Sequence, residues 1–123
     1  MLPFLLYWKK FKKCYNYDME QIDKIITNLN RTIKKWFSDF DGLYLYGSYA
    51  LGNATKDSDI DLVALFGSKL PREKRMNLWK VIGEIEAELG VILDLHPMTL
   101  VELKQNPIYY KEVVDKGVYY GAW

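Results

Sequence analysis

Residues 59–66 limit the folds open to this chain more than any other segment. The segment is apolar from Ile60 onward except for Asp61, which predicts a buried β-strand. Side chains two residues apart in a strand point to the same face, so Asp59 and Asp61 should share one face. Ile60 and Leu62 should then fill the core on the other face. The chain is therefore expected to form a sheet with one apolar face and one face that carries two carboxylates.

Helical patterns on both sides of this strand indicate how the sheet is covered. Apolar residues recur at three- and four-residue steps over residues 18–37, and again from Pro71 to an expected helix cap at Gly90. The other expected elements are strands over 43–46, 91–96 and 118–120, short helices over 100–104 and 107–114, a turn over 38–42 and a strand end at Pro97. This order predicts a mixed α/β (α+β) sheet with helices packed mainly on one face.

Length and charge restrict the class of protein. A chain of 123 residues has the size of one domain. Lys and Arg number 17 against 16 Asp and Glu, a net charge of +1, so no global field draws a polyanion and direct nucleic-acid binding is not expected. The single Cys14 cannot form an intramolecular disulfide, which favours a reducing, cytoplasmic setting. Any phosphate chemistry must come from a local site.

The N-terminal region has a different character, because residues 1–8 are apolar and four lysines follow within residues 9–13. The apolar stretch is too short for a membrane span and lacks the charge order of an export signal, so no membrane association is expected. We expect an N-terminal extension over residues 1–18, whose status as native sequence is left open, and a single domain over residues 19–123.

Two neighbouring motifs carry the candidate chemistry. After a short apolar strand, Gly47 allows close backbone approach to a ligand, and Ser48 offers a hydroxyl and backbone N–H groups to an anion. Asp59 and Asp61 are two close carboxylates that repel each other unless cations neutralise them, and oxygen ligands suit Mg²⁺ or Mn²⁺. Asp94 interrupts an apolar strand and is the best candidate for a third carboxylate. Together these residues predict a metal site that receives a phosphate.

Other chemically active side chains near these motifs have structural interpretations. His96 shares the strand face of Asp94, but a single histidine before a proline is more often structural than a ligand. The tyrosines of the C-terminal region are expected in the core or in interfaces, namely Tyr109, Tyr110, Tyr119 and Tyr120. The candidate site is therefore confined to the glycine–serine pair and the three aspartates.

The run Gly47-Ser48-x-Ala50-x-Gly52, followed after five residues by Ser58-Asp59-Ile60-Asp61-Leu62, resembles the hallmark motif of DNA polymerase beta-like nucleotidyltransferases. The resemblance covers about residues 20–120, and the short chain is similar to the minimal (MNT, MntA-like) branch of that family. It implies a palm-like sheet, with Gly47 and Ser48 holding the phosphates of ATP. Asp59, Asp61 and Asp94 would be the catalytic triad and bind two Mg²⁺ ions, with Mn²⁺ as the alternative.

The chain departs from the family pattern at Leu51, where many members carry arginine before the second glycine. Cationic help to the phosphates would then have to come from elsewhere. Lys56 or a partner chain are the two sources that the resemblance leaves open.

The same resemblance implies a partner. Minimal nucleotidyltransferases of this kind act as antitoxins of HEPN-domain ribonuclease toxins, by transferring AMP from ATP to a tyrosine hydroxyl of the toxin. On that interpretation this chain is an adenylyltransferase antitoxin in a hetero-oligomer or homo-oligomer. Two alternatives stay open: a non-catalytic module that masks a partner or senses nucleotide, and nucleotidyl transfer to a small molecule, which normally needs a second domain.

Overall fold

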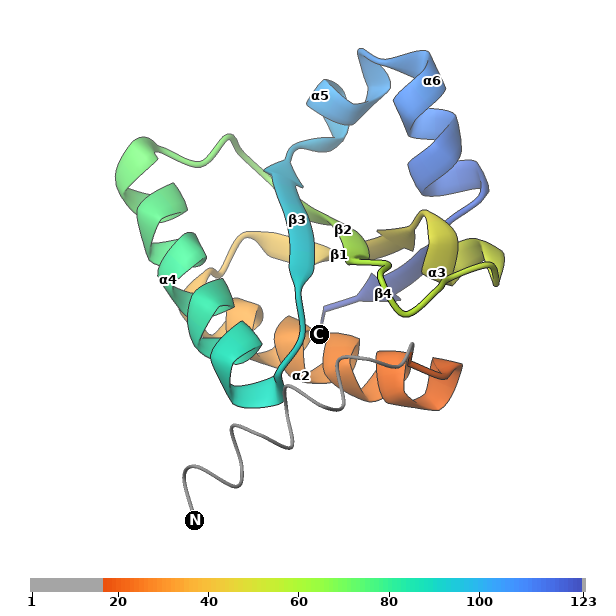
Figure 1. Cartoon of the computed structure of the whole chain (residues 1–123). Coiled ribbons are helices and arrows are strands. Elements are labelled where there is room, and N and C mark those ends of the chain that lie inside the picture. The colour runs from red at the N-terminus through yellow and green to blue at the C-terminus, as the bar shows by residue number, and fades with distance from the viewer. Residues whose placement is uncertain (1–16, 123) are drawn as a thin grey trace.

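A computed structural model describes residues 17–122 and shows one sheet with helices on both faces (Figure 1). The helices are α2 (Met19–Trp36), α3 (Ser48–Leu51), α4 (Arg72–Leu89), α5 (Leu100–Lys104), α6 (Pro107–Tyr110) and the π-helix η1 (Lys111–Asp115). The strands are β1 (Phe40–Tyr46), β2 (Ile60–Phe66), β3 (Leu93–Met98) and β4 (Val118–Gly121). The predicted mixed α/β architecture is confirmed.

The strand pairing decides which residues meet. In the described part of the chain, four strands form one sheet in the order β3-β2-β1-β4. β1 pairs antiparallel with β2 and with β4, whereas β2 and β3 are parallel and are connected through the crossover helix α4. This register places Tyr46, Asp61 and Asp94 side by side on three neighbouring strands. Because register partners point to the same face, these three side chains belong to one face of the sheet.

The long helices α2 and α4 pack on the opposite face and form the main core. α2 begins at a capping box, in which Asp18 accepts a hydrogen bond from the Gln21 backbone N–H at 2.8 Å and Gln21 accepts one from the Asp18 N–H at 3.0 Å. Its buried residues recur at helical spacing and contact the apolar residues of the strands. Ile60 and Leu62, 1% and 0% exposed, lie in this core as the strand periodicity predicts.

The second face of the sheet has a smaller cover. α5, α6 and η1 supply a separate apolar cluster centred on four buried residues, Val63, Leu65, Leu103 and Val113. Tyr46 and Tyr109 pack against this cluster as half-buried side chains. The cluster covers the part of the face near β1, while Asp94 and His96 on the edge strand β3 stay about half exposed. The helices are thus mainly, but not wholly, on one face.

The strands β1 and β3 differ from the sequence-based expectation at their boundaries. Residues 40–42 were expected in a turn, yet β1 begins at Phe40, because this side chain is fully buried against Phe66 and Phe37 in the main core. β3 begins at Leu93 and not at residue 91, and it continues through Pro97 to Met98. Proline lacks a backbone donor, but β3 lies at the edge of the sheet, where an unpaired position is tolerated. Tertiary packing therefore overrides local turn signals at both places.

The expected N-terminal extension falls largely on residues 1–16, which lie outside the described residues. α2 begins at Met19, close to the expected start of the domain, and the boundary at residue 18 stays a prediction. Between residues 17 and 122, the helices are all too short or too polar to cross a lipid bilayer.

Candidate active site

The candidate site is centred on the carboxylates of Asp61 and Asp94, which the parallel pairing of β2 and β3 sets next to each other. Asp61 lies near the start of β2, and Asp94 is its direct register partner on β3. Because Asp61 and Asp94 are register partners on neighbouring strands, their two carboxylates lie close together. This is the arrangement that the sequence predicted for Asp61 and Asp94.

Burial and charge act together on Asp61. The pKa of the Asp61 carboxyl is raised to about 6, first by burial and then by the charge of the adjacent Asp94 and a side-chain hydrogen bond with it. The charge of Asp59 adds to this effect, and His96 opposes it. The raised pKa of Asp61 reflects the cost of placing a negative charge beside Asp94, a cost that a bound cation would reduce. The donor chemistry of the pair, oxygen atoms only, suits Mg²⁺ or Mn²⁺.

Gly47 lies directly against Asp61. Its backbone has φ +74° and ψ −152°, a conformation that side chains rarely adopt, and a Cβ atom there would lie 2.3 Å from the Asp61 Oδ2 atom. Glycine is favoured here both by the backbone conformation and by the Asp61 carboxylate, which would have to move to admit a Cβ atom. The predicted link between the glycine–serine turn and the aspartate motif is a direct contact in the structure.

The helix α3 holds this turn in place. Ser48 is its first residue, and the next residue, Tyr49, is only 5% exposed and packs in the main core. The Tyr49 hydroxyl also accepts a hydrogen bond from the Tyr17 backbone N–H at 3.3 Å. Sequence reasoning missed Tyr49 as an anchor, although its place after the motif serine is visible in the sequence. The burial of Tyr49 thereby anchors α3, which begins with Ser48 directly after Gly47.

The loop that leads to Asp59 is ordered by its own polar side chains. The Ser58 hydroxyl accepts a hydrogen bond from the Thr55 backbone N–H at 2.9 Å, and the Ser58 N–H donates to the Thr55 carbonyl at 3.0 Å. Asp59 follows as an exposed residue directly before β2, and Lys56 is exposed in the same loop. Ser58 thus has a local role in shaping the loop that presents Asp59.

A three-carboxylate metal site is not assembled in this conformation. Across residues 17–122, no three acidic, histidine or cysteine side chains are arranged to hold a single metal ion. Asp59 is near enough for its charge to act on Asp61, but the pair that the strands bring together is Asp61 and Asp94. The roles of Gly47, Ser48, Asp59, Asp61 and Asp94 in binding and catalysis stay predictions.

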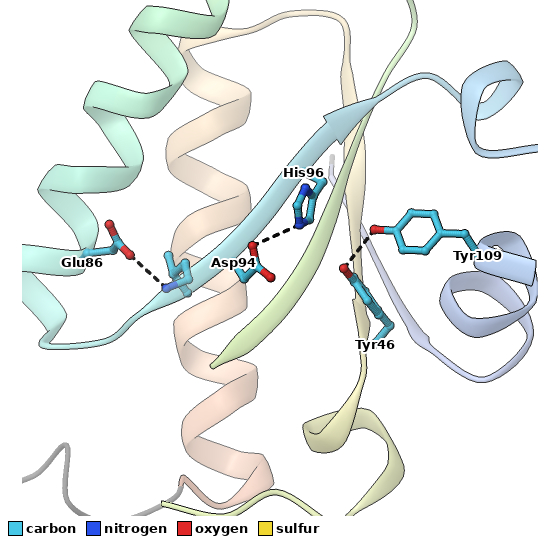
Figure 2. Close-up of polar contacts among 6 residues, drawn as sticks. Tyr46, Glu86, Asp94, His96 and Tyr109 are labelled. Atoms are coloured by element: carbon cyan, nitrogen blue, oxygen red, sulfur yellow. Dashed lines mark hydrogen bonds and ion pairs between the residues drawn. The ribbon is translucent and has the colours of Figure 1, made fainter. Parts of the chain in front are cut away.

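Two further contacts fix Asp94 on the edge strand. His96 Nε2 lies 3.0 Å from Asp94 Oδ1, with both side chains about half exposed (Figure 2). On the other side, Glu86 of α4 accepts a hydrogen bond at 3.0 Å from the backbone N–H of Leu93, the residue before Asp94 (Figure 2). His96 therefore contacts a candidate site residue, and its expected structural role stays a prediction.

Tyr46 and Tyr109 also line the site. Tyr46 is the register partner of Asp61 on β1, and the Tyr109 hydroxyl on α6 donates a hydrogen bond to the Tyr46 hydroxyl at 2.9 Å (Figure 2). Tyr46 was not among the predicted site residues, although its place directly before Gly47 is a usable signal. Tyr109 has no such signal, because only the packing of α6 against the sheet brings it here.

The comparisons with known proteins agree with this geometry. The family model described as "Nucleotidyltransferase domain" matches residues 22–120. Spectinomycin 9-adenylyltransferase of Campylobacter jejuni is 31% identical over 83 residues, which are 67% of this chain and 32% of that protein. The chain thus spans about a third of the length of this curated relative.

Solved toxin–antitoxin structures share the fold. A complex of tri-AMPylated Shewanella oneidensis HEPN toxin with MNT antitoxin matches with a TM-score of 0.54 and 20% identity, over 85% of this chain and 72% of that chain. A toxin–antitoxin crystal structure with AMP-PNP matches with a TM-score of 0.57 and 22% identity, over 79% and 71% of the two chains. At this identity the likeness establishes the fold. Because the family model covers residues 22–120, which are most of the chain and include the predicted motif residues, this chain belongs to the nucleotidyltransferase domain family.

Proposed function

We propose that this chain is a divalent-metal-dependent adenylyltransferase that modifies a hydroxyl group of a partner protein. The observation that carries the proposal is the contact between three sequence motifs: Asp61 lies beside Asp94 on parallel strands and directly against Gly47. A catalytic function explains why two repelling carboxylates are kept together on a partly open face, where a purely structural sheet would place apolar side chains.

The residues have separate roles in this proposal. Gly47 and Ser48 receive the phosphates of ATP, because Gly47 supplies a backbone turn without a side chain directly against Asp61, and Ser48 adds a hydroxyl as the first residue of α3. Asp61 and Asp94 hold Mg²⁺, with Mn²⁺ as the alternative, and Asp59 completes the set. Bound divalent cations supply neutralisation of phosphate charge and activation of the acceptor hydroxyl.

The transfer itself is an in-line displacement. The acceptor oxygen forms a bond to the α-phosphorus of ATP as the bond from that phosphorus to pyrophosphate breaks, and pyrophosphate leaves. Asp94 accepts the proton of the attacking hydroxyl. Its contact with His96 keeps the carboxylate turned along β3, so that one oxygen is oriented before the substrates bind.

The acceptor in this proposal is a tyrosine hydroxyl of a HEPN-type toxin, so that the chain acts as its antitoxin in a hetero-oligomer. Structures of an AMPylated HEPN toxin with its MNT antitoxin and of a toxin–antitoxin with AMP-PNP share this fold and support the assignment. Cytoplasmic location follows from the same proposal.

A second candidate is transfer of AMP to a small molecule. The 31% identity with spectinomycin 9-adenylyltransferase favours it. The match covers only about a third of that enzyme's length, so the identity does not extend to the rest of that enzyme. The experiment below includes spectinomycin for this reason.

The test is incubation of the purified full-length chain with α-labelled ATP and Mg²⁺, with and without a HEPN protein encoded beside it, followed by intact-mass analysis. We expect one or more AMP groups on the HEPN protein. Asp61→Asn should lower the rate by more than about 100-fold, because even changes around a metal ligand cost about 10–100-fold. The matched control is Glu88→Gln, which removes an exposed carboxylate from α4 on the other side of the sheet.

Three results would contradict the proposal or change it. Equal loss in Glu88→Gln would show that charge in general, and not the site, controls the rate. Label on spectinomycin but not on the HEPN protein would favour the small-molecule acceptor. Tight binding of the HEPN protein without label, from ATP or from any other nucleotide, would favour a module that masks its partner by contact alone.

A further inference from the structure

The hydroxyl groups of Tyr46 and Tyr109 meet beside the carboxylates of Asp61 and Asp94. Tyr46 ends β1, directly before Gly47, and faces the same side of the sheet as Asp61. Tyr109 reaches it from α6, with a hydroxyl–hydroxyl distance of 2.9 Å and ring centroids 5.6 Å apart in an edge-on arrangement (Figure 2). Two elements far apart in the sequence thus converge on one polar contact beside the candidate site.

Both hydroxyls of this pair stay protonated at neutral pH. Burial raises the pKa of Tyr46 and of Tyr109, and the negative charges of Asp61 and Asp94 act in the same direction. The two hydroxyls therefore carry two protons, and the hydrogen bond from Tyr109 to Tyr46 uses one of them. Among residues 17–122, no acceptor takes the proton of Tyr46. The Tyr46–Tyr109 pair is therefore an uncharged hydrogen-bond donor next to the carboxylates of Asp61 and Asp94.

We propose that the Tyr46 hydroxyl donates a hydrogen bond to a phosphoryl oxygen of the bound nucleotide, and that Tyr109 is a positioning residue for it. The inference rests on the proposed function, since Gly47 and Ser48, directly after Tyr46, are where that function places the phosphates. An uncharged donor contacts a phosphate without adding charge beside Asp61 and Asp94, whose negative charges a bound metal ion would neutralise. The bond from Tyr109 occupies one lone pair of the Tyr46 oxygen and so restricts the direction of its proton.

Other tyrosines of the same face lack this combination. Tyr44 lies one row further along β1, where its register partner is Val63, and its ring contacts Tyr119. The Tyr119 hydroxyl donates to the Asp41 carbonyl at 3.0 Å, at the other end of β1. Tyr110 follows Tyr109 on α6, and its hydroxyl forms no hydrogen bond within residues 17–122. Only Tyr46 combines a place before Gly47, the face of Asp61 and a second hydroxyl that holds it.

The experiment measures nucleotide binding to the full-length chain in Mg²⁺, using an ATP analogue with a methylene bridge between the α- and β-phosphorus and, separately, adenosine. Tyr46→Phe should weaken binding of the analogue by about tenfold, the typical cost of one hydrogen bond to a charged group. Binding of adenosine should not change. Tyr109→Phe should act in the same direction, and the double variant should be no weaker than Tyr46→Phe alone, because both act through one contact.

Two matched controls separate this role from a structural one. Tyr119→Phe removes a hydroxyl hydrogen bond away from the carboxylates, and Tyr110→Phe removes a hydroxyl from the same helix as Tyr109. Both should bind the analogue as the wild type does. Melting temperatures of all variants, measured beside the binding curves, report any loss of stability.

The outcomes distinguish this inference from the proposed function. Wild-type affinity for the analogue in Tyr46→Phe, or an equal loss for the analogue and adenosine, would overturn the inference. If the analogue binds but no acceptor is ever labelled, the proposed transfer fails while the ratio of the two affinities still decides the role of Tyr46. If the wild type binds no analogue at all, both are wrong.

Discussion

The two faces of the sheet have opposite character although they are built from alternate residues of the same strands. The face under α2 and α4 is an apolar core in which Ile60 and Leu62 are almost fully buried. The other face carries Asp61 between them in sequence, together with Asp94, and is only partly covered by α5, α6 and η1. One face therefore supplies the stability that lets the other hold two repelling carboxylates, as the strand period of two residues permits.

The largest effect on stability is expected when substitutions of Leu62 and Asp61 are compared, since these neighbours on β2 face opposite sides of the sheet. Leu62→Ala should lower the free energy of unfolding by about 2–5 kcal/mol, because it leaves a cavity in the main core. Asp61→Asn should raise it at neutral pH by about 1 kcal/mol, after allowance for solvent screening, because it removes a half-buried charge beside Asp94. Urea denaturation followed by circular dichroism measures both. A loss of stability in Asp61→Asn would show that the two faces do not divide the roles in this way.

Next in size is the effect at the contact between the phosphate turn and the carboxylates. Gly47→Ala should destabilise the protein by about 1–3 kcal/mol, because the new Cβ meets Asp61 Oδ2 and the backbone has a positive φ. Gly52→Ala is a reference for a positive φ alone, since Gly52 has φ +76° and ψ 17°, in the left-handed helical region, and nothing within 4 Å of an added Cβ. A larger loss in thermal unfolding for Gly47→Ala reports the contact with Asp61 together with the rarer ψ of −152° at Gly47. Equal effects would mean that backbone conformation alone requires glycine at residue 47.

The smallest effect is a pH dependence confined to the polar face. The folded-state pKa of Asp61, about 6, lies above its ordinary value of 3.8, so the folded state binds the proton more tightly than the unfolded state. Stability from this group is present below about pH 4 and is lost as the pH rises through about 6. The difference between wild type and Asp61→Asn, measured by denaturation in EDTA from pH 4 to 7, should therefore change by about 1 kcal/mol, again after allowance for solvent screening. A difference that does not vary with pH would contradict the raised pKa.

Much of this structure could be predicted from local patterns. The helical period over residues 18–37, the short helix expected over 100–104 and the cap at Gly90 correspond to α2, α5 and the end of α4. The predictions were wrong at β1 and β3, because the neighbouring residues in the sequence suggested a turn at Phe40 and a strand end at Pro97. Their actual roles depend on what packs beside them, which local patterns do not contain.

The candidate site divides in the same way. Asp61 and Gly47 could be named because their residue types and spacing are unusual for a plain strand and turn. Asp94 could be named only as a polar interruption of an apolar strand, and its position beside Asp61 depends on the parallel crossover through α4. Tyr109 could not be assigned to the site at all, since its helix reaches the sheet only in the folded chain.

The amino-acid sequence by itself determined the order of the helices and strands and the division of β2 into an apolar and an acidic face, because these follow from side-chain period and residue type. Its motif residues also carry the resemblance to the nucleotidyltransferase family. Tertiary structure alone decided which charges meet, how far Asp61 is desolvated and which hydroxyls border the carboxylates. Those properties depend on strand register and on distances between segments remote in sequence. Electrostatic interactions and hydrogen bonds are set by such distances, and no local pattern encodes them.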